Sequence, residues 1–380
     1  MTTNPSSQSA ISFPNFHPTP GLPAYYDEQA QSWQVFRYAQ VQRVLSDFAT
    51  FSSRRGKLAT NDEGPNTSSL NDLDPPQHQQ LRALVMQAFT PRIVATFEPR
   101  ITHLVNKLLE AVIDRREMDV ISDFSALLPL IVIAEILGVP VSDHHYLRKL
   151  SDASIPMVTP AAAKARYEMW DYFATLVKQR QRLPGQNLIS NMIEAQIDGQ
   201  RLTTSELASL CCLLLIAGNE TTKTWIGNAM ACFDQHPDAL RQVQEEPDLL
   251  STALEEVLRY LPPVTSFPRV AAIDTVIDGQ QIKAGQWIIP HIDAANRDET
   301  QFPDPETFDI RRSPNRHLTF GHGIHFCLGA PLARLEARIA LSIMFGRLTE
   351  IERVRSVPLE TIVTPLGYKF KHFPITFKRK

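Results

Sequence analysis

Cys327 is the residue of this chain whose type and setting point most directly to chemistry. It stands in the segment 320–329, which reads Phe-Gly-His-Gly-Ile-His-Phe-Cys-Leu-Gly. The glycines permit backbone conformations and close approaches that a Cβ would hinder, so a flat cofactor could lie against this loop. The run 330–348 that follows has apolar residues at helical spacing. A helix there would aim its positive dipole end and free amides at the sulfur, which favours a thiolate.

Two other interpretations of Cys327 are open at this point. The residue could be a buried small hydrophobic side chain, as many intracellular cysteines are. His322, His325 and Cys327 also lie close enough in the sequence to suggest zinc. A closed zinc site needs four ligands, however, and the other cysteines form no partner pair at finger-like spacing.

The segment 217–222, Ala-Gly-Asn-Glu-Thr-Thr, interrupts a long predicted helix with poor helix formers. A mid-helix glycine costs roughly 1 kcal/mol relative to alanine, and a local violation of this kind invites a functional interpretation. Glu220 is titratable and could relay protons, swinging between solvent and a pocket, and Thr221 offers a hydroxyl. The plain alternative is that Gly218 permits close helix packing and the threonine hydroxyl bonds within its own turn.

Helical patterns must position these residues. Thr203 and Glu206 stand at capping-box spacing, and the helix that they begin is predicted to reach residue 235, roughly 50 Å away at 1.5 Å per residue. Apolar residues at spacings of three and four predict further helices, and prolines mark several of their ends. These helices are predicted over 38–47, 77–89, 90–112, 124–137, 143–151, 161–182, 187–196, 237–245 and 249–260.

Strand signals are fewer, so the sequence predicts a mainly α protein with a small β region. Residues 269–277 and 281–289 alternate in polarity around Asp278-Gly279, which predicts a hairpin. The tail 367–377 is a further strand candidate, and Asp198-Gly199 predicts a tight turn before the longest helix.

Composition excludes several classes of protein. The chain has 380 residues, 43% hydrophobic and 21% charged, with a net charge of −3, which gives no sign of nucleic-acid binding. Four cysteines are too few for a disulfide framework. The first 16 residues lack a signal-peptide pattern, and the apolar run 210–217 is far shorter than the roughly 20 residues of a membrane span. We therefore expect a soluble, cytoplasmic protein without a membrane association.

The cysteine loop and the helix segment together resemble the cytochrome P-450 family. The haem-binding signature Phe-x-x-Gly-x-x-x-Cys-x-Gly is filled at Phe320, Gly323, Cys327 and Gly329. The family's oxygen-activating segment, Ala/Gly-Gly-x-Asp/Glu-Thr-Thr/Ser, is filled at 217–222. The resemblance runs from about residue 23 to residue 377.

The resemblance implies a triangular-prism helical domain that holds haem b between the long helix and the helix after Cys327. Residues 1–22 would be a loose N-terminal arm, and residues 23–380 one haem-binding monooxygenase domain. Cys327 would ligate the iron and Glu220 and Thr221 would manage protons. Other residues implied to contact the haem are Phe320, Gly321, Gly329, Ala217 and Gly218.

Two further motifs carry the resemblance. The family's Asp-Pro-Pro-x-His-x-x-x-Arg segment is matched at 74–82, so His78 and Arg82, with Arg269 and His325, are implied to bind the haem propionates. The family's Glu-x-x-Arg pair falls on Glu256 and Arg259, which would fix the scaffold under the cysteine loop.

One position departs from the family pattern. Many relatives supply a third arginine in a Pro-x-Arg-Phe segment, where this chain has Thr307. Arg311, Arg312 or Arg297 could replace it, and the sequence does not choose between them.

The resemblance also places a substrate pocket above the haem, along the segments 54–73, 157–166, 213–217, 264–267 and 363–366. Apolar side chains there would contact the substrate, and hydroxyls would orient a polar group. The pocket residues predicted on this basis are Leu213, Leu214, Val264, Thr265, Phe267, Val363 and Thr364.

The implied activity is monooxygenation, that is, the hydroxylation or epoxidation of an apolar small molecule. The protein is expected to act as a monomer. Because the sequence holds no fused flavin or iron–sulfur segment, electrons would come from a ferredoxin with its reductase, or from a flavodoxin-type carrier. Arg92, Arg334 and Arg338 could present positive charge to such an acidic carrier. Two rivals are a peroxide-driven peroxygenase on the same haem and a non-catalytic haem- or ligand-binding protein.

Overall fold

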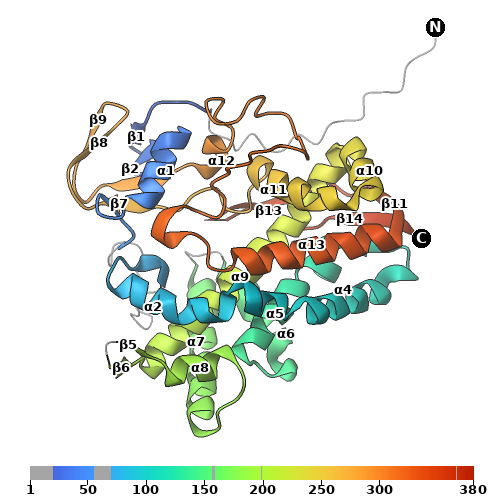
Figure 1. Cartoon of the computed structure of the whole chain (residues 1–380), viewed down its shortest axis with the longest axis horizontal. Coiled ribbons are helices and arrows are strands. Elements are labelled where there is room, and N and C mark those ends of the chain that lie inside the picture. The colour runs from blue at the N-terminus through green and yellow to red at the C-terminus, as the bar shows by residue number, and fades with distance from the viewer. Residues whose placement is uncertain (1–19, 55–69, 156–158, 198, 365) are drawn as a thin grey trace.

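Helices form most of the molecule in the computed structural model, which describes residues 20–54, 70–155, 159–197, 199–364 and 366–380 (Figure 1). The prediction of a mainly α protein with a small β region is confirmed. The α-helices are α1 (Tyr38–Ser46), α2 (Gln77–Met86), α3 (Pro91–Ala95), α4 (Glu98–Ile113), α5 (Leu128–Leu137), α6 (His144–Ser154), α7 (Pro160–Arg182), α8 (Leu188–Glu194), α9 (Thr204–Gln235), α10 (Pro237–Glu245), α11 (Leu250–Tyr260), α12 (Ile292–Ala295) and α13 (Ala330–Arg347).

Proline explains two predicted helix boundaries that were wrong. The helix predicted over 90–112 is two helices, α3 and α4, and the stretch 124–137 divides between a π-helix, η4 (Val120–Ser125), and α5. Pro99 and Pro129 each stand in the first turn of the helix that follows the break. A proline is tolerated in a first turn, where its missing N–H has no partner, but not inside a continuous helix.

The longest helix, α9, has the predicted capping box. The Thr203 hydroxyl accepts a hydrogen bond from the Glu206 amide at 3.2 Å, and the Glu206 carboxylate accepts one from the Thr203 amide at 2.8 Å. The helix is α-helical from Thr204 to Gln235, including 217–222. The poor helix formers at 217–222 therefore do not end or divide the helix. Figure 1 shows α9 passing through the middle of the molecule, where α5 and α13 contact it.

Short strands form the β region. One sheet has the order β1 (Tyr25–Asp27), β2 (Ser32–Val35), β10 (Trp287–Pro290), β7 (Arg269–Ala271), β3 (Phe51–Ser52), and another the order β11 (Leu348–Arg353), β14 (Pro374–Arg379), β4 (Glu117–Asp119). The antiparallel pairs are β5 (Gln196–Ile197) with β6 (Gln200–Arg201), β8 (Thr275–Ile277) with β9 (Gln280–Ile282), and β12 (Thr361–Thr364) with β13 (Gly367–Phe370).

The Asp-Gly hairpin prediction is confirmed in a shorter form. Asp278 and Gly279 have φ of +50° and +80°, the positive values of a tight two-residue hairpin turn between β8 and β9. The two predicted strands each divide, because β7 and β10 leave the hairpin to join the five-stranded sheet. The turn predicted at Asp198-Gly199 lies partly outside the described residues, since 198 is among those not described.

The apolar core has a helical part and a sheet part. The larger cluster joins the helices, and the smaller one packs around β2, β10 and α1. The stretch Val120–Leu137 is long and apolar enough to cross a membrane by length and composition, but 72% of it is buried inside the fold, as in the core helix of a soluble protein. Most of the predicted N-terminal arm, residues 1–19, lies outside the described residues.

Candidate functional site

The cysteine loop is closed on itself just before α13. The Cys327 amide donates a hydrogen bond to the Phe320 carbonyl at 2.8 Å, across the 3₁₀ turn η7 (Gly323–His325). Gly321 and Gly323 have φ of +72° and +70°, and a Cβ at 323 would lie 2.7 Å from Ser46 Cα. These two positions therefore require glycine. Gly329 has φ of −84°, with no other atom within 4 Å of where a Cβ would lie.

The Cys327 thiol lies against the N-terminus of α13, as predicted. Burial raises its pKa, and the Gly329 and Ala330 amides, Arg82 and Arg334 act in the opposite direction. The helix N-terminus therefore lowers the pKa of Cys327 as predicted, but burial has the larger effect and the net shift of the pKa is upward. Coordination to a metal cation would deprotonate such a thiol outright.

The four predicted propionate partners lie together beside this loop. The centroids of the His78 and His325 rings lie 4.1 Å apart. In addition to burial, the positive charges of Arg82 and Arg269 lower the pKa of both histidines. Burial, and then Arg82, lower the pKa of His78, which Asp74 partly raises. Burial, Arg269, His78 and Arg82 bring the pKa of His325 down to about 3. Two arginines thus lie close to two histidines that stay neutral at pH 7, in a partly buried histidine–arginine cluster.

His78 tests whether this cluster fits an anionic group. It is 1% exposed, yet neither ring nitrogen has a hydrogen-bond partner among the described residues. A buried polar group without a partner costs free energy, so it indicates a missing acceptor. Arg82 meanwhile donates to the Phe326 carbonyl at 2.6 Å, next to Cys327. The residues present fit a cofactor that carries carboxylates close to the cysteine, as haem does.

The two histidines of the cluster differ in one contact that the sequence did not indicate. His325 Nε2 lies 2.9 Å from the Ser53 hydroxyl, and Ser53 is held through its amide by the Asp74 carboxylate at 3.1 Å. Ser53 follows β3, far from both motifs in the sequence. The structure therefore ties the loop of His325 to the Asp-Pro-Pro segment.

The α9 segment combines close packing with local hydrogen bonding. A Cβ at Gly218 would lie 3.1 Å from Ile133 Cγ1 on α5, so this glycine allows the two helices to approach. The Thr221 hydroxyl donates to the Ala217 carbonyl at 2.9 Å. Both observations match the structural alternative given for this segment, in which Gly218 permits close helix packing and the threonine hydroxyl bonds within its own turn. They leave open a second role, because Ala217 is exposed and a threonine hydroxyl can accept while it donates.

Glu220 is held by lysines from two elements. Its side chain is 5% exposed, and its carboxylate contacts Lys223 Nζ at 3.3 Å on the next turn of α9 and Lys369 Nζ on β13 at closer range. Lys223 was detectable in the sequence from its i, i+3 spacing, whereas Lys369 lies 149 residues away. The predicted swing of Glu220 toward solvent would have to break both contacts.

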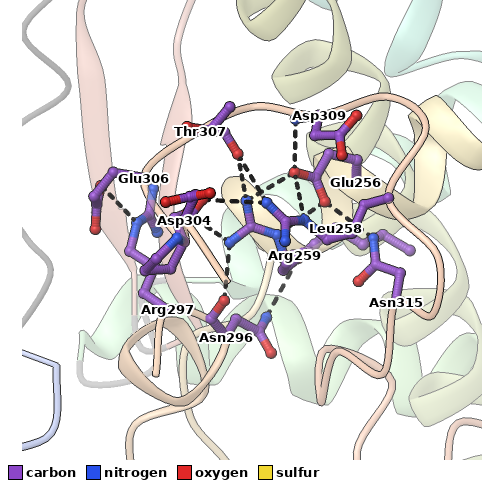
Figure 2. A network of polar contacts seen from close by, with 12 residues as sticks. Glu256, Leu258, Arg259, Asn296, Arg297, Asp304, Glu306, Thr307, Asp309 and Asn315 are labelled. Atoms are coloured by element: carbon purple, nitrogen blue, oxygen red, sulfur yellow. Dashed lines mark hydrogen bonds and ion pairs between the residues drawn. The ribbon is translucent and has the colours of Figure 1, made fainter. Parts of the chain in front are cut away.

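Glu256 and Arg259 form a buried ion pair on α11 (Figure 2). Both side chains are fully buried, and the guanidinium makes two hydrogen bonds to the carboxylate, at 2.7 and 2.8 Å. Arg259 also donates to the carbonyls of Asn296, Pro305 and Thr307 at 2.7–3.0 Å. A buried charge pair is stable only with such additional hydrogen bonds.

Of the three candidates for the missing third arginine, Arg312 is the one that contacts Glu256. Its Nε lies 3.2 Å from Glu256 Oε1, and it donates to the Pro303, Asp304 and Thr307 carbonyls at 2.8–3.3 Å. Thr307 thus contributes its backbone oxygen where relatives carry the cation. Arg311 pairs instead with the exposed Glu246, and Arg297 with Glu306 while lying over the Tyr260 ring.

Asn296 connects this network to the cysteine loop. Its carbonyl accepts from Arg259, its side-chain oxygen accepts from the Leu318 amide at 2.8 Å, and its side-chain nitrogen donates to the Thr319 hydroxyl at 2.9 Å. Thr319 directly precedes Phe320, where the loop begins. The Glu256–Arg259 pair therefore reaches the loop through two hydrogen-bonded steps.

Two of the predicted pocket segments are in contact. The Thr265 amide donates to the Leu366 carbonyl at 2.8 Å, and a Cβ at Gly367 would lie 3.0 Å from Thr265 Cγ2. Val363 is 69% exposed at the end of β12, whereas Leu214 and Val264 are buried and Leu213, Phe267 and Thr364 are intermediate. Residues 55–69, 157–158 and 365 of the predicted pocket segments lie outside the described residues.

Ion pairs already engage two of the arginines proposed to face an electron carrier. Arg334 makes two hydrogen bonds of 2.8 Å to Glu255, and Arg338 lies 3.4 Å from Glu98. These residues rim a groove of about 350 Å³ between α3, α11 and α13. The positive charge that these two positions present is therefore smaller than the sequence suggested.

Glu255 should stabilise the fold in a pH-dependent way. Hydrogen bonds from Arg334 and His317 outweigh the upward effect of burial and bring its pKa from 4.5 to about 2. The Glu255 carboxylate therefore adds at most about 3 kcal/mol to the free energy of unfolding. This stabilisation is complete above about pH 4.5 and is lost as the pH falls through 2. We expect Glu255→Gln to lower the urea-unfolding free energy most at pH 7, and by less as the pH falls below 4.5. The exposed Glu98→Gln should show little effect, and an equal loss for Glu255→Gln at pH 7 and pH 3 would contradict the assignment.

The zinc interpretation of the cysteine loop finds no ligand set. Over the residues that the structure describes, no three or more His, Cys, Asp and Glu side chains are grouped so that they could hold a metal ion. His322 and Cys327 therefore do not share a site of that kind within this region.

Comparisons with known proteins agree with the motifs. The family model described as "Cytochrome P450" matches residues 156–359. A "Putative cytochrome P450 YjiB" of Bacillus subtilis is 39% identical over 378 residues, 95% of this chain and 94% of that protein. The "Cyclomarin C epoxidase CymV" of Salinispora arenicola is also 39% identical, over 90% of each chain.

Solved structures show the same fold. The substrate-free structure of CYP109E1 from Bacillus megaterium has a TM-score of 0.89 at 36% identity and covers 95% of this chain and 96% of that one. Its complex with testosterone gives the same TM-score over 94% of each chain. The hydroxylase HmtN of himastatin biosynthesis has a TM-score of 0.86 at 37% identity, with 94% of each chain covered.

Proposed function

Because the chain belongs to the cytochrome P450 family of haem b monooxygenases, we propose that it hydroxylates or epoxidises an apolar small molecule with electrons from a separate carrier protein. The overall reaction is R–H + O₂ + 2 e⁻ + 2 H⁺ → R–OH + H₂O for a hydroxylation. The observation that carries the proposal is the Cys327 thiol at the N-terminus of α13, beside the histidine–arginine cluster in which the buried His78 has no hydrogen-bond partner among the described residues.

The residues of the loop and of the histidine–arginine cluster would hold the cofactor. Cys327 would ligate the iron, and His78, Arg82, Arg269 and His325 would bind the propionates. Haem held by the Cys327 thiolate would supply the activation of dioxygen, and the thiolate would favour it by donating electron density. Gly321 and Gly323 allow the loop to close tightly, which keeps the sulfur at a fixed position in front of α13.

Thr221 and Glu220 would help to deliver the two protons that the reaction consumes. Thr221 is positioned by its hydrogen bond to Ala217, and its oxygen keeps lone pairs for a donor. Glu220, the neighbouring residue, could bring protons to this side of α9 once its contacts with lysines open.

For the substrate, we propose a rigid apolar molecule of the size of a steroid or macrocycle. Relatives include a structure in complex with testosterone, one in complex with corticosterone, a cyclomarin C epoxidase and a mycinamicin IV hydroxylase/epoxidase. Leu213, Leu214, Val264, Phe267 and Val363 would form apolar walls. The hydroxyls of Thr265 and Thr364 would orient one polar group.

We propose a ferredoxin with its reductase, or a flavodoxin-type carrier, as the electron donor in the cytoplasm. The carrier would approach the face of α13. The ion pairs of Arg334 and Arg338 with Glu255 and Glu98 would have to be shared with it or exchanged.

The experiment that tests this function uses the haem-loaded protein and an oxygen label. Steroids, macrolides, terpenoids and fatty acids are first screened for a shift of the Soret band. The best binder is then turned over with ferredoxin, reductase, NADPH and ¹⁸O₂, and we expect one labelled oxygen atom per product molecule. Product without label, or product formed faster with hydrogen peroxide alone, would favour the peroxygenase instead.

Thr221→Ala separates a catalyst from a haem protein that only binds ligands. We expect the variant to keep the Soret shift of the binder but to form less product per NADPH and more hydrogen peroxide. Unchanged coupling would remove Thr221 from the proposed proton path.

A further inference from the structure

A line of four alternating charges runs through the molecule at Glu220. Asp152 on α6 contacts Lys223 Nζ at 3.1 Å, Lys223 contacts Glu220 at 3.3 Å, and Glu220 contacts Lys369 on β13. Asp152 is 42% exposed, whereas the other three side chains are exposed by 13% or less. The line therefore begins at the surface, where Arg148 also lies 3.8 Å from Asp152, and ends at the β12–β13 hairpin.

The geometry fixes the carboxylate of Glu220 from both sides. Lys369 Nζ contacts Oε1 and Lys223 Nζ contacts Oε2, so each oxygen already accepts from an ammonium group. Lys223 belongs to the same helix as Glu220 and moves with it. Lys369 belongs to a separate hairpin, so a shift of that hairpin relative to α9 would break its contact with Glu220.

The hairpin that carries Lys369 also forms part of the predicted substrate wall. Lys369 is the register partner of Ile362, one residue before Val363, and both Ile362 and Val363 are exposed apolar side chains. The Leu366 carbonyl accepts from the Thr265 amide, which belongs to another predicted wall segment. A molecule that presses on Val363 and Thr265 would therefore act on the strand that positions Lys369.

We propose that Lys369 is a positioning residue that withholds Glu220 from proton delivery until a bound substrate displaces the β12–β13 hairpin. The inference rests on the proposed function, in which Glu220 supplies protons for oxygen activation. Holding Glu220 back would prevent a side reaction that wastes electrons. Without substrate, proton delivery would lead to O₂ + 2 e⁻ + 2 H⁺ → H₂O₂, which consumes the electrons of the carrier without product.

Lys369→Met tests the inference, and Lys371→Met is its matched control. Lys371 lies two residues further along the same segment and pairs with the exposed Glu360 at 3.0 Å. In haem-loaded protein with ferredoxin, reductase and NADPH but no substrate, Lys369→Met should raise hydrogen peroxide formation several-fold. Lys371→Met should leave it unchanged, and Lys369→Arg should restore the low rate. With the Soret-screened binder present, Lys369→Met and the original protein should differ much less.

A readout that does not depend on turnover is the urea-unfolding midpoint in a double-mutant cycle. Effects of Glu220→Gln and Lys369→Met should be non-additive because the residues are in contact, whereas Glu220→Gln and Lys371→Met should add. Additive effects in the first pair, or substrate-free peroxide formation equal in Lys369→Met and Lys371→Met, would overturn the inference. So would weaker binding in Lys369→Met as its only effect. A failure of the proposed function is distinguishable, because it would appear in the original protein as absent labelled product.

Discussion

Cys327→Ala is expected to abolish the red-shifted Soret band of the reduced carbon monoxide complex and to reduce product formation to background. The substitution removes the side chain that lies at the N-terminus of α13, where the Gly329 and Ala330 amides face the sulfur. Alanine offers neither a ligand for iron nor the electron donation of a thiolate. The loss should therefore affect the chemistry rather than the fold.

The measurement pairs the carbon monoxide difference spectrum with a haem-content assay. Cys232→Ala is the control, because Cys232 is fully buried in the core and should keep the band. Haem bound by Cys327→Ala through the histidine–arginine cluster alone would show a blue-shifted band instead. A red-shifted band that survived in Cys327→Ala would remove Cys327 as the ligand.

Local signals in the sequence predicted the elements that depend on neighbouring residues. The capping box at Thr203, the Asp278-Gly279 turn and the length of α9 are all local, and the structure has each of them. The predicted helices over 90–112 and 124–137 were wrong at their boundaries, although Pro99 and Pro129 carried the information. A proline that begins a helix and one inside a helix give the same apolar spacing, so the pattern alone joined them.

The sheet could not be predicted in the same way, because its strands are short and distant in sequence. β2 pairs with β10, more than 250 residues later, and β14 lies between β11 and β4. Strands of three or four residues show almost no alternation on which a prediction could rest. Their pairing follows from tertiary packing instead.

The candidate site likewise contains some residues that the sequence could indicate and others that only tertiary contacts reveal. Motif positions such as His78 and His325 could be assigned because their spacing along the chain carries the resemblance, and the structure brings them together. Arg312 and Lys369 act through contacts made 56 and 149 residues away, and no spacing encodes such contacts. A charged residue in a sequence does not indicate whether it faces water or a buried carboxylate.

Arg259→Met is expected to destabilise the protein by about 3–5 kcal/mol, the usual cost of removing one partner of a buried pair. The guanidinium makes two hydrogen bonds to Glu256 and three to backbone carbonyls, and both charged side chains are fully buried. Its loss would leave the carboxylate with Arg312, Asn315 and the Asp309 amide, and one of its two strongest ionic partners would be gone. Urea unfolding followed by circular dichroism measures the change.

Two adjacent arginines decide whether the effect comes from the network or from charge in general. Arg312→Met should also destabilise, because Arg312 is 9% exposed and contacts Glu256, whereas Arg311→Met should cost less than about 1 kcal/mol since its partner Glu246 is exposed. Because Asn296 joins the network to Thr319, Arg312→Met should also release haem faster than Arg311→Met does. Equal stability and equal haem loss in the two variants would mean that Arg312 does not replace the arginine missing at Thr307.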